Sequence, residues 1–298
     1  GLSPDRFILS YCDRALGITS AEEQPVLPKG NNLSLHLLEL FTSQVAKVGM
    51  TDGIRQVLQE ESDALRAYYE QAGILIARPA GGTSCRLAIS AKGGTNAENH
   101  NHNDVGSYAV ALGSETMVGD QGGPNSYPGD YFNGDAPQKY KIKGSFGHPV
   151  PVVDGRTQSS GGKAKGVVLQ KEFTNEKDVF SIDYTSAYST PNLDKLIRTF
   201  VYDRQGKGNF TVGDEFTAKT PIRFETAITT RADWKVLDDT HLLLATDSEQ
   251  MIVAIEASGK VAFTSETIEV NSPAYTRIGI ALKNQSKEGY IRLKMYTK

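Results

Sequence analysis

The stretch LIRTFVYDRQGKGNFTVGDEF, residues 196–216, shows most directly how this chain folds. Its two outer runs, 196–203 and 210–216, are rich in the β-branched and aromatic residues that favour strands. The segment RQGKGN between them, residues 204–209, contains two glycines and is typical of the tip of a hairpin. The stretch therefore predicts two antiparallel strands joined by a tight turn.

Similar short runs continue through most of the chain, from Ile74 onward. Examples are ILIAR at 74–78, SYAVALG at 107–113 and MIVAIEA at 251–257, with Gly, Asn and Asp between such runs. About a dozen strands without intervening helices predict a mainly β protein built as a large antiparallel sandwich, here assigned to residues 73–298. The preceding segment, 1–72, is predicted to be helical, because apolar residues recur at helical spacing in NNLSLHLLELFTSQVAKVGM, residues 31–50.

Composition narrows the function classes. A net charge of −3 over 298 residues argues against a general nucleic-acid-binding surface. No apolar run approaches the roughly 18 residues of a membrane-spanning helix. Cys12 and Cys85 have no metal or redox spacing, so each is expected to be a small buried residue, with a disulfide between them left open. The opening GLSPDRF lacks an initiator methionine, and the chain is therefore expected to be a fragment of a longer polypeptide.

Residues 119–164 form a long stretch that is rich in Gly, Pro, Asn and Asp and poor in strand patterns. Its five aromatic residues argue against disorder, and a long ordered loop in a compact domain is usually functional. Its second half begins a basic region with Asp154 as the only acid between residues 139 and 171. That excess favours an anionic ligand, with a solvated lysine surface as the alternative. The basic residues are Lys139, Lys141, Lys143, Arg156, Lys163, Lys165 and Lys171.

The segment ENHNHNDVGSY, residues 98–108, holds two of the five histidines. In an extended segment His100 and His102 face the same side, as a metal-binding pair does, although two ordinary loop histidines are the alternative. Asp120 ends a predicted strand at a loop-rich rim, and Pro149 restricts His148 to an extended backbone. Two histidines and a carboxylate suit Zn²⁺. Asp104 is the alternative carboxylate, unless its side chain instead hydrogen-bonds the backbone of the Asn-rich turn that contains it.

Three blocks around these residues resemble the heparinase II/III family of polysaccharide lyases. They are NHNHNDVGSYAVALGSETMVGDQG at 99–122, SYPGDYF at 126–132 and KYKIKGSFGHPVPVVDG at 139–155. The resemblance covers roughly residues 67–240 and fades beyond them. It implies an (α/α) toroid followed by an antiparallel β-sandwich, with uronic-acid polysaccharides cleaved by β-elimination in the cleft between them. Segment 1–72 then resembles the end of the toroid and the linker, and most of the toroid is absent.

The resemblance also assigns roles to residues. It implies that His102, Asp120 and His148 hold a zinc ion, and that His100 acts in catalysis. The zinc is expected chiefly to pin the long loop to the sheet and so position His100. Tyr127 matches a tyrosine near the cleft, with a role either in stacking or proton transfer or in loop packing.

Two further residues, Asn99 and Arg198, are expected to contact the substrate. The alternative for Arg198 is a place on the surface of a strand, and the alternative for Asn99 is a role in holding the backbone of its loop.

The expected substrate is an acidic polysaccharide of the heparin or heparan sulfate type. Alginate or another unsulfated uronan remains an alternative, as does a non-catalytic carbohydrate-binding domain that keeps the metal site. The resemblance places the parent protein in the periplasm or outside the cell. It also implies that this fragment is inactive by itself, because the family takes an essential tyrosine and an Asn or His from the toroid.

Overall fold

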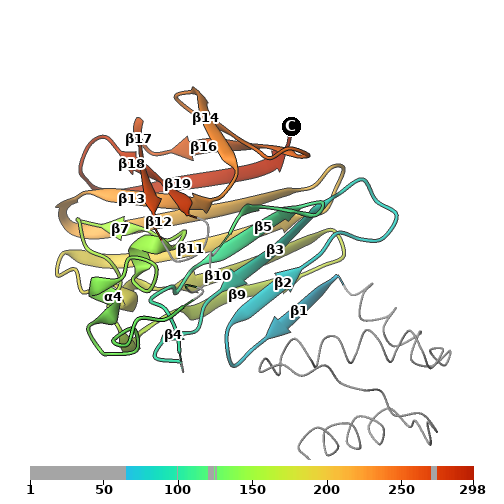
Figure 1. Ribbon diagram of the computed structural model, residues 1–298. Coiled ribbons are helices and arrows are strands. Elements are labelled where there is room, and N and C mark those ends of the chain that lie inside the picture. The colour runs from blue at the N-terminus through green and yellow to red at the C-terminus, as the bar shows by residue number, and fades with distance from the viewer. Residues whose placement is uncertain (1–64, 99, 120–123, 125, 270–273) are drawn as a thin grey trace, which may run out of the picture. The chain divides into compact units, whose positions relative to one another are not determined.

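A computed structural model describes residues 65–98, 100–119, 124, 126–269 and 274–298 (Figure 1). The helices predicted before residue 65, and the predicted site residues Asn99 and Asp120, lie outside these ranges. The compact unit that the structure describes begins at Leu65.

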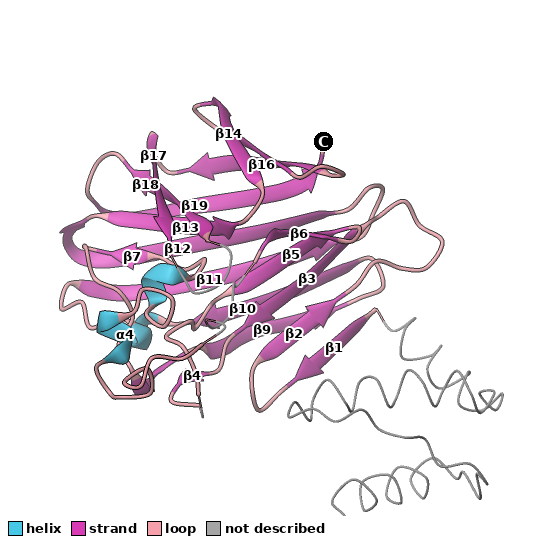
Figure 2. Ribbon diagram, viewed as in Figure 1, coloured by secondary structure: helices cyan, strands magenta, loops and turns pink. Residues whose placement is uncertain are grey.

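The described chain is mainly β, and every pair of neighbouring strands is antiparallel (Figure 2). The prediction of a large antiparallel β-sandwich is thus confirmed. One sheet contains, in spatial order, β14 (Asp233–Asp238), β15 (His241–Ala245), β16 (Gln250–Ala257), β19 (Ser286–Thr297), β12 (Asn209–Ile222), β11 (Leu193–Asp203), β10 (Lys177–Asp183) and β9 (Val167–Phe173).

The opposing layer consists of two smaller sheets. The first contains β1 (Arg66–Tyr69), β2 (Ile74–Ala77), β3 (Leu87–Lys92), β5 (Tyr108–Leu112) and β6 (Glu115–Val118). The second contains β17 (Val261–Ile268), β18 (Tyr275–Leu282), β13 (Phe224–Thr230) and β7 (Val152–Val153). Hydrogen bonds at the end of β6 join the two: Gly119 N–H donates to Thr229 O at 3.0 Å, and Thr230 Oγ1 donates to Met117 O at 2.7 Å.

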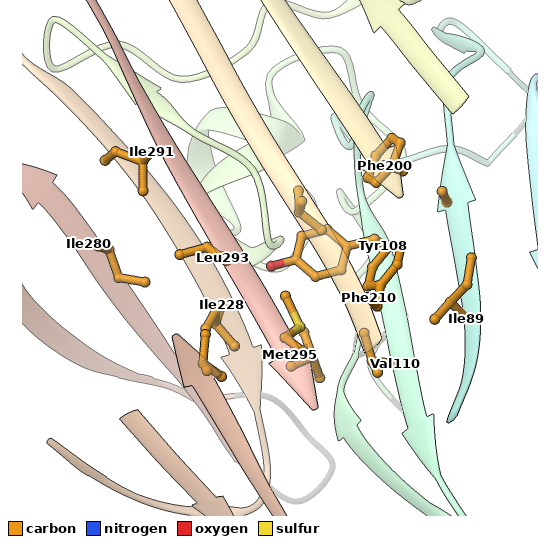
Figure 3. Packing of buried hydrophobic residues seen from close by; sticks show 14 of the residues in the cluster. Ile89, Tyr108, Val110, Phe200, Phe210, Ile228, Ile280, Ile291, Leu293 and Met295 are labelled. Carbon is orange, nitrogen blue, oxygen red and sulfur yellow. The ribbon is translucent and has the colours of Figure 1, made fainter. Parts of the chain in front are cut away.

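The core lies between these layers (Figure 3). Ile89 and Val110 of the first small sheet and Ile280 of the second belong to one buried cluster with Phe210 and Leu293 of the large sheet. Alternate residues of β3, β5 and β11 are buried, as the two-residue period of a half-buried strand requires. In β11, for example, Leu196, Arg198, Phe200 and Tyr202 are buried. The same face therefore carries one charged residue among apolar ones.

The hairpin predicted at 196–216 is present, with β11 and β12 joined through a turn at residues 204–208. The register is symmetric about Gly206, whose φ of +59° lies in the left-handed region that glycine adopts without strain. Phe200 therefore pairs with Val212, and Arg198 lies directly opposite Asp214.

The predicted helical segment extends too far toward the C-terminus. Residues 66–69 form strand β1, which pairs with β2, where a helix up to residue 72 was expected. Tyr68 of this strand packs on Phe173 and Phe180 of the large sheet, with ring centroids 5.6 and 5.8 Å apart. These tertiary contacts favour a strand and outweigh the local helical pattern of residues 66–69. The pattern of apolar residues in the sequence does not show that such contacts exist.

The long loop region gathers at one end of the sandwich, together with the short helix α4 (Ala136–Lys139) (Figure 2). The other elements there are the 3₁₀ turn η1 (Ser145–Gly147) and a small sheet of β4 (Thr95–Asn96) and β8 (Gly161–Lys165). A second 3₁₀ turn, η2 (Thr185–Ala187), follows β10. Tyr131 and Ile142 of the long loop form a small apolar cluster with Ile268 and Tyr275, so the region has a core of its own.

Two expectations from composition can be compared with this fold. Cys85 is a buried free thiol, as expected of a small apolar residue, while Cys12 lies outside the described ranges. Within the described part of the chain, no helix has the length and apolar character needed to cross a membrane.

Candidate functional site

The loop between β4 and β5 carries the two predicted histidines in different environments. His100 is exposed and has a φ of +58°, a left-handed conformation that is uncommon for residues other than glycine. His102 is partly buried. The loop is tied down by hydrogen bonds within it, such as Asn101 N–H to Glu98 O at 3.2 Å and Ser107 N–H to Asp104 O at 2.9 Å. The two side chains are therefore presented in distinct ways, one toward solvent and one toward the protein.

His102 meets His148, which lies 46 positions later in the chain. Their ring centroids are 5.2 Å apart, and His148 is buried. The backbone of His148 is extended, with φ −118° and ψ 161°, as predicted from the proline that follows it. Two of the three predicted metal ligands are thus neighbours, while the third, Asp120, lies outside the described residues.

The donor set can be tested against zinc geometry. Zinc binds histidine nitrogen at about 2.0–2.1 Å with tetrahedral angles, which places two ligating imidazole centres roughly 5 Å apart. The observed spacing of 5.2 Å fits that arrangement. Among the described residues no third His, Cys, Asp or Glu joins the pair to make a metal-binding group. The alternative ligand Asp104 instead forms an ion pair with Lys92, at 2.6 Å.

A buried tyrosine contacts His102. Tyr131 Oη lies 3.0 Å from His102 Nε2, a hydrogen bond whose direction depends on the histidine tautomer. Burial raises the pKa of Tyr131 to about 12. Tyr127, the tyrosine predicted from sequence, is exposed and contacts Tyr131 with ring centroids 5.0 Å apart and planes tilted by 53°. Both belong to the SYPGDYF block, and the spacing of the block gives no indication of which one faces the histidines.

Gln158 links the histidine loop to the segments beneath it. Its side-chain Oε1 accepts hydrogen bonds from Asn96 Nδ2 at 3.0 Å and from Val105 N–H at 3.1 Å. Its Nε2 donates to Val105 O at 2.7 Å, and its backbone N–H donates to Ser145 Oγ at 2.8 Å. A single buried amide therefore connects the loop after β4 with the turn that precedes His148.

Arg198 is not a substrate-binding residue in this structure. Its side chain is completely buried, and its guanidinium donates five hydrogen bonds, which use all of its N–H groups. Asp214 accepts two of them at 2.7 Å each, and Thr226 Oγ1 accepts one at 3.1 Å. The remaining two go to Gly106 O at 2.7 Å and Pro149 O at 2.8 Å. Arg198 thereby holds the end of the histidine loop and the residue after His148 at one point.

Three of the seven residues of the predicted basic region form ion pairs with acids that lie outside it in the sequence. Lys139 pairs with Asp130, Lys141 pairs with Glu266, and Lys171 pairs with Glu70 at 2.8 Å. Lys143 is buried, which lowers its pKa, and its Nζ donates to Tyr131 O. None of the ion pairs formed among the described residues involves Lys143, Arg156, Lys163 or Lys165, and the last three carry the remaining exposed positive charge of the region.

The chain was compared with protein-family models, curated protein sequences and solved structures. No protein-family model matches the chain, and no curated protein sequence matches it significantly. Solved structures do match. The heparan sulfate lyase HepC from Pedobacter heparinus superposes with a TM-score of 0.67 and 14% identity, over 99% of this chain and 48% of that one. The chain has the fold of part of a heparan sulfate lyase.

Two further structures agree with this match. One described as heparinase III gives a TM-score of 0.61 at 17% identity, over 78% of this chain and 36% of that one. Another heparinase III gives 0.65 at 12% identity, over 89% and 42%. The chain therefore spans less than half the length of the lyase structures that it resembles. At these identities the likeness establishes the fold alone.

Proposed function

We propose that the protein to which this chain belongs is a polysaccharide lyase of the heparinase II/III type, which cleaves uronic-acid-containing chains by β-elimination. The observation that carries the proposal is the exposed His100 two residues before His102, whose ring lies 5.2 Å from that of His148. The fold shared with heparan sulfate lyase structures supports the same conclusion.

The chemistry explains why these residue types are needed. β-Elimination removes the proton at C5 of the uronate, next to its carboxylate, and expels the oxygen at C4. Negative charge develops on the carboxylate, so hydrogen-bond donors placed there lower the barrier. A base must accept the C5 proton, and an acid must protonate the leaving oxygen.

His100 is the described residue best placed to face the substrate, because it is exposed on a loop held by internal hydrogen bonds. Its imidazole serves either as a hydrogen-bond donor to the carboxylate or in proton transfer. Tyr127 has an exposed ring at the same rim and is the proposed second contact. Tyr131 stays protonated at neutral pH, since its pKa is about 12, and its hydroxyl positions His102.

Zinc is the proposed resident metal, with His102, Asp120 and His148 as ligands. When bound, it would supply a fixed positive charge that anchors the long loop beside the cleft. Nε2 of His102 is hydrogen-bonded to the Tyr131 hydroxyl, so a zinc ion held by this nitrogen would compete with that bond.

The substrate is proposed to be an acidic polysaccharide of the heparin or heparan sulfate type. Lys163 and Lys165 of β8 supply positive charge near the histidine loop, because β8 pairs with β4 just before that loop. An unsulfated uronan such as alginate fits the same carboxylate chemistry. Asn99 remains a proposed substrate contact, and the proposed location is periplasmic or extracellular, where such polymers occur.

The test is the ultraviolet absorbance of the C4–C5 unsaturated product, measured with the full-length protein on heparan sulfate, hyaluronan, chondroitin and alginate. We expect product from at least one, with loss of activity in His100→Ala and retention in the control His241→Ala, a partly exposed histidine on β15. Absence of product from all four substrates would refute the lyase proposal, and sugar binding without product would favour a non-catalytic carbohydrate-binding domain.

Two further measurements concern the fragment and the metal. The 298-residue chain by itself is expected to give no product, because it spans less than half of the lyases it resembles. Elemental analysis of protein purified without chelators should find one zinc per chain. His148→Ala should lose that zinc and His241→Ala should keep it, and unchanged zinc in His148→Ala contradicts the ligand assignment.

A further inference from the structure

Two exposed aromatic rings lie side by side in the long loop. Tyr127 is 54% exposed and Phe132 is 50% exposed, with ring centroids 5.1 Å apart and planes tilted by 46°. The large apolar side chains exposed in the described part of the chain include one other aromatic residue, Tyr69. Exposed apolar surface that gathers beside a candidate active site is typical of a ligand-binding surface.

The inner side of Phe132 packs against other side chains. Phe132 packs edge-on against the buried Tyr131, with centroids 5.4 Å apart and planes at 82°. The ammonium group of Lys143 lies 4.8 Å from the centroids of both the Phe132 and Tyr131 rings. The inner side of Phe132 is thus occupied by a cation and a ring, while about half of the residue stays exposed.

The backbone around the two rings is ordered by local hydrogen bonds. Tyr131 N–H donates to Pro128 O and Asn133 N–H donates to Asp130 O, both at 3.0 Å. Lys143 Nζ holds Tyr131 O from below. Because these contacts order the backbone that carries Phe132, less conformational entropy is lost when a ligand binds.

The pair of exposed rings, Tyr127 and Phe132, is called the platform. It adjoins the proposed catalytic histidine, His100. The centroid of the His100 ring lies 4.9 Å from that of Phe132, with planes tilted by 39°. The three rings therefore form a continuous row from Tyr127 through Phe132 to His100. A sugar resting on the first two would place its neighbour in the chain beside the histidine.

We propose that Tyr127 and Phe132 stack against the C–H face of a pyranose ring of the polysaccharide and so position the adjoining uronate at His100. This inference rests on the proposed function. A pyranose has an apolar face made of ring C–H groups, and covering half-exposed aromatic rings with it removes apolar surface from water.

The area of the platform favours a sugar over a protein partner. An aromatic side chain offers about 150–250 Å², so two half-exposed rings offer roughly 200 Å². A stable protein interface needs about 800 Å² from each partner. The platform thus matches one or two sugar rings and falls well short of a protein contact.

The experiment measures binding of a heparan sulfate tetrasaccharide and of an alginate tetrasaccharide to the 298-residue chain, by saturation-transfer NMR and calorimetry. We expect binding of at least one, with saturation concentrated on ring C–H protons. Phe132→Ala and Phe132→Leu should each weaken binding about tenfold or more, as loss of a stacking ring typically does. Phe132→Tyr and Tyr127→Phe should bind like the unaltered chain, and so should the control Tyr69→Ala, which removes an equally exposed tyrosine from β1.

The outcomes separate this proposal from the lyase proposal. No detectable binding of either sugar at millimolar concentration, or equal binding by Phe132→Ala, overturns the platform. Equal binding accompanied by a lower melting temperature in Phe132→Ala assigns the rings to packing against another part of the protein. Weakened binding in Phe132→Ala, with no elimination product from the full-length protein, supports the platform while refuting the lyase.

Discussion

Replacing Arg198 by methionine should destabilise the sandwich strongly, because the residue forms a fully buried ion pair. The substitution keeps an unbranched side chain of moderate length but removes all five hydrogen bonds of the guanidinium. Asp214, which is 1% exposed, then keeps only its bonds from Tyr184 Oη at 2.6 Å and Thr226 Oγ1 at 2.7 Å. A buried carboxylate without its cation is the main cost.

The magnitude follows from the buried ion pair. Removing one partner of such a pair costs about 3–5 kcal/mol, because the other charge stays buried without compensation. For a domain of this size, each kcal/mol lowers the melting temperature by about 2–4 °C, which gives a decrease of roughly 6–20 °C. Urea unfolding followed by the fluorescence of Trp234 is the suitable assay, since this is the only tryptophan in the chain and it packs against the sandwich core.

Two further variants make the reasoning refutable. Arg198→Met combined with Asp214→Leu removes the stranded charge as well and should recover at least half of the lost stability. Arg292→Met is the control, because Arg292 is 39% exposed and its ion pairs with Glu215 and Glu256 should contribute less than about 1 kcal/mol. If Arg198→Met costs no more than this control, or the double variant is as unstable as the single one, the buried-pair argument is wrong.

Other consequences concern buried polar groups. Burial raises the pKa of Tyr131 to about 12, and raises the pKa values of Tyr108 and Tyr184 well above the usual range. The unfolded chain releases these protons at lower pH than the folded protein, so the free energy of unfolding is unaffected below about pH 10 and falls as pH rises toward 12 and beyond. The tyrosinate absorbance of these buried residues should rise together with unfolding. Titration of all tyrosines while the protein is still folded would contradict this. Gln158→Leu should cost about 2–4 kcal/mol in urea unfolding, because both backbone polar groups of Val105 lose their partner and the amide nitrogen of the buried Asn96 keeps only its bond to Ser159 O. Tyr131→Phe should cost only about 1 kcal/mol but shift the imidazole NMR signals of His102, and unchanged signals would count against their hydrogen bond.

Much of the fold follows from local sequence. The β-rich runs and the glycine turn predict the β11–β12 hairpin, and symmetry about Gly206 places Arg198 opposite Asp214. Pro149 predicts the extended backbone at His148, because the ring of a proline excludes helical conformations of the preceding residue. These features depend on φ and ψ preferences of adjacent residues, which act wherever the sequence occurs.

Tertiary structure alone decided which side chains meet. His102 lies beside His148, and the carbonyls of Gly106 and Pro149 in the same two segments accept hydrogen bonds from one buried arginine, contacts that no spacing in the sequence predicts. Arg198 is a buried structural residue and not a substrate contact. Its charge is neutralised by Asp214 in the buried interior of the protein.

The same holds for charge and for the choice between tyrosines. Glu266 pairs with Lys141 from 125 positions away, so the local sequence overstates the net positive charge of the basic run. Tyr131 and Tyr127 stand in one short block, and only packing buries the first against His102 and leaves the second exposed. Local sequence determined the strands and turns because those depend on neighbouring residues, whereas burial and charge pairing depend on which distant segments the fold brings into contact.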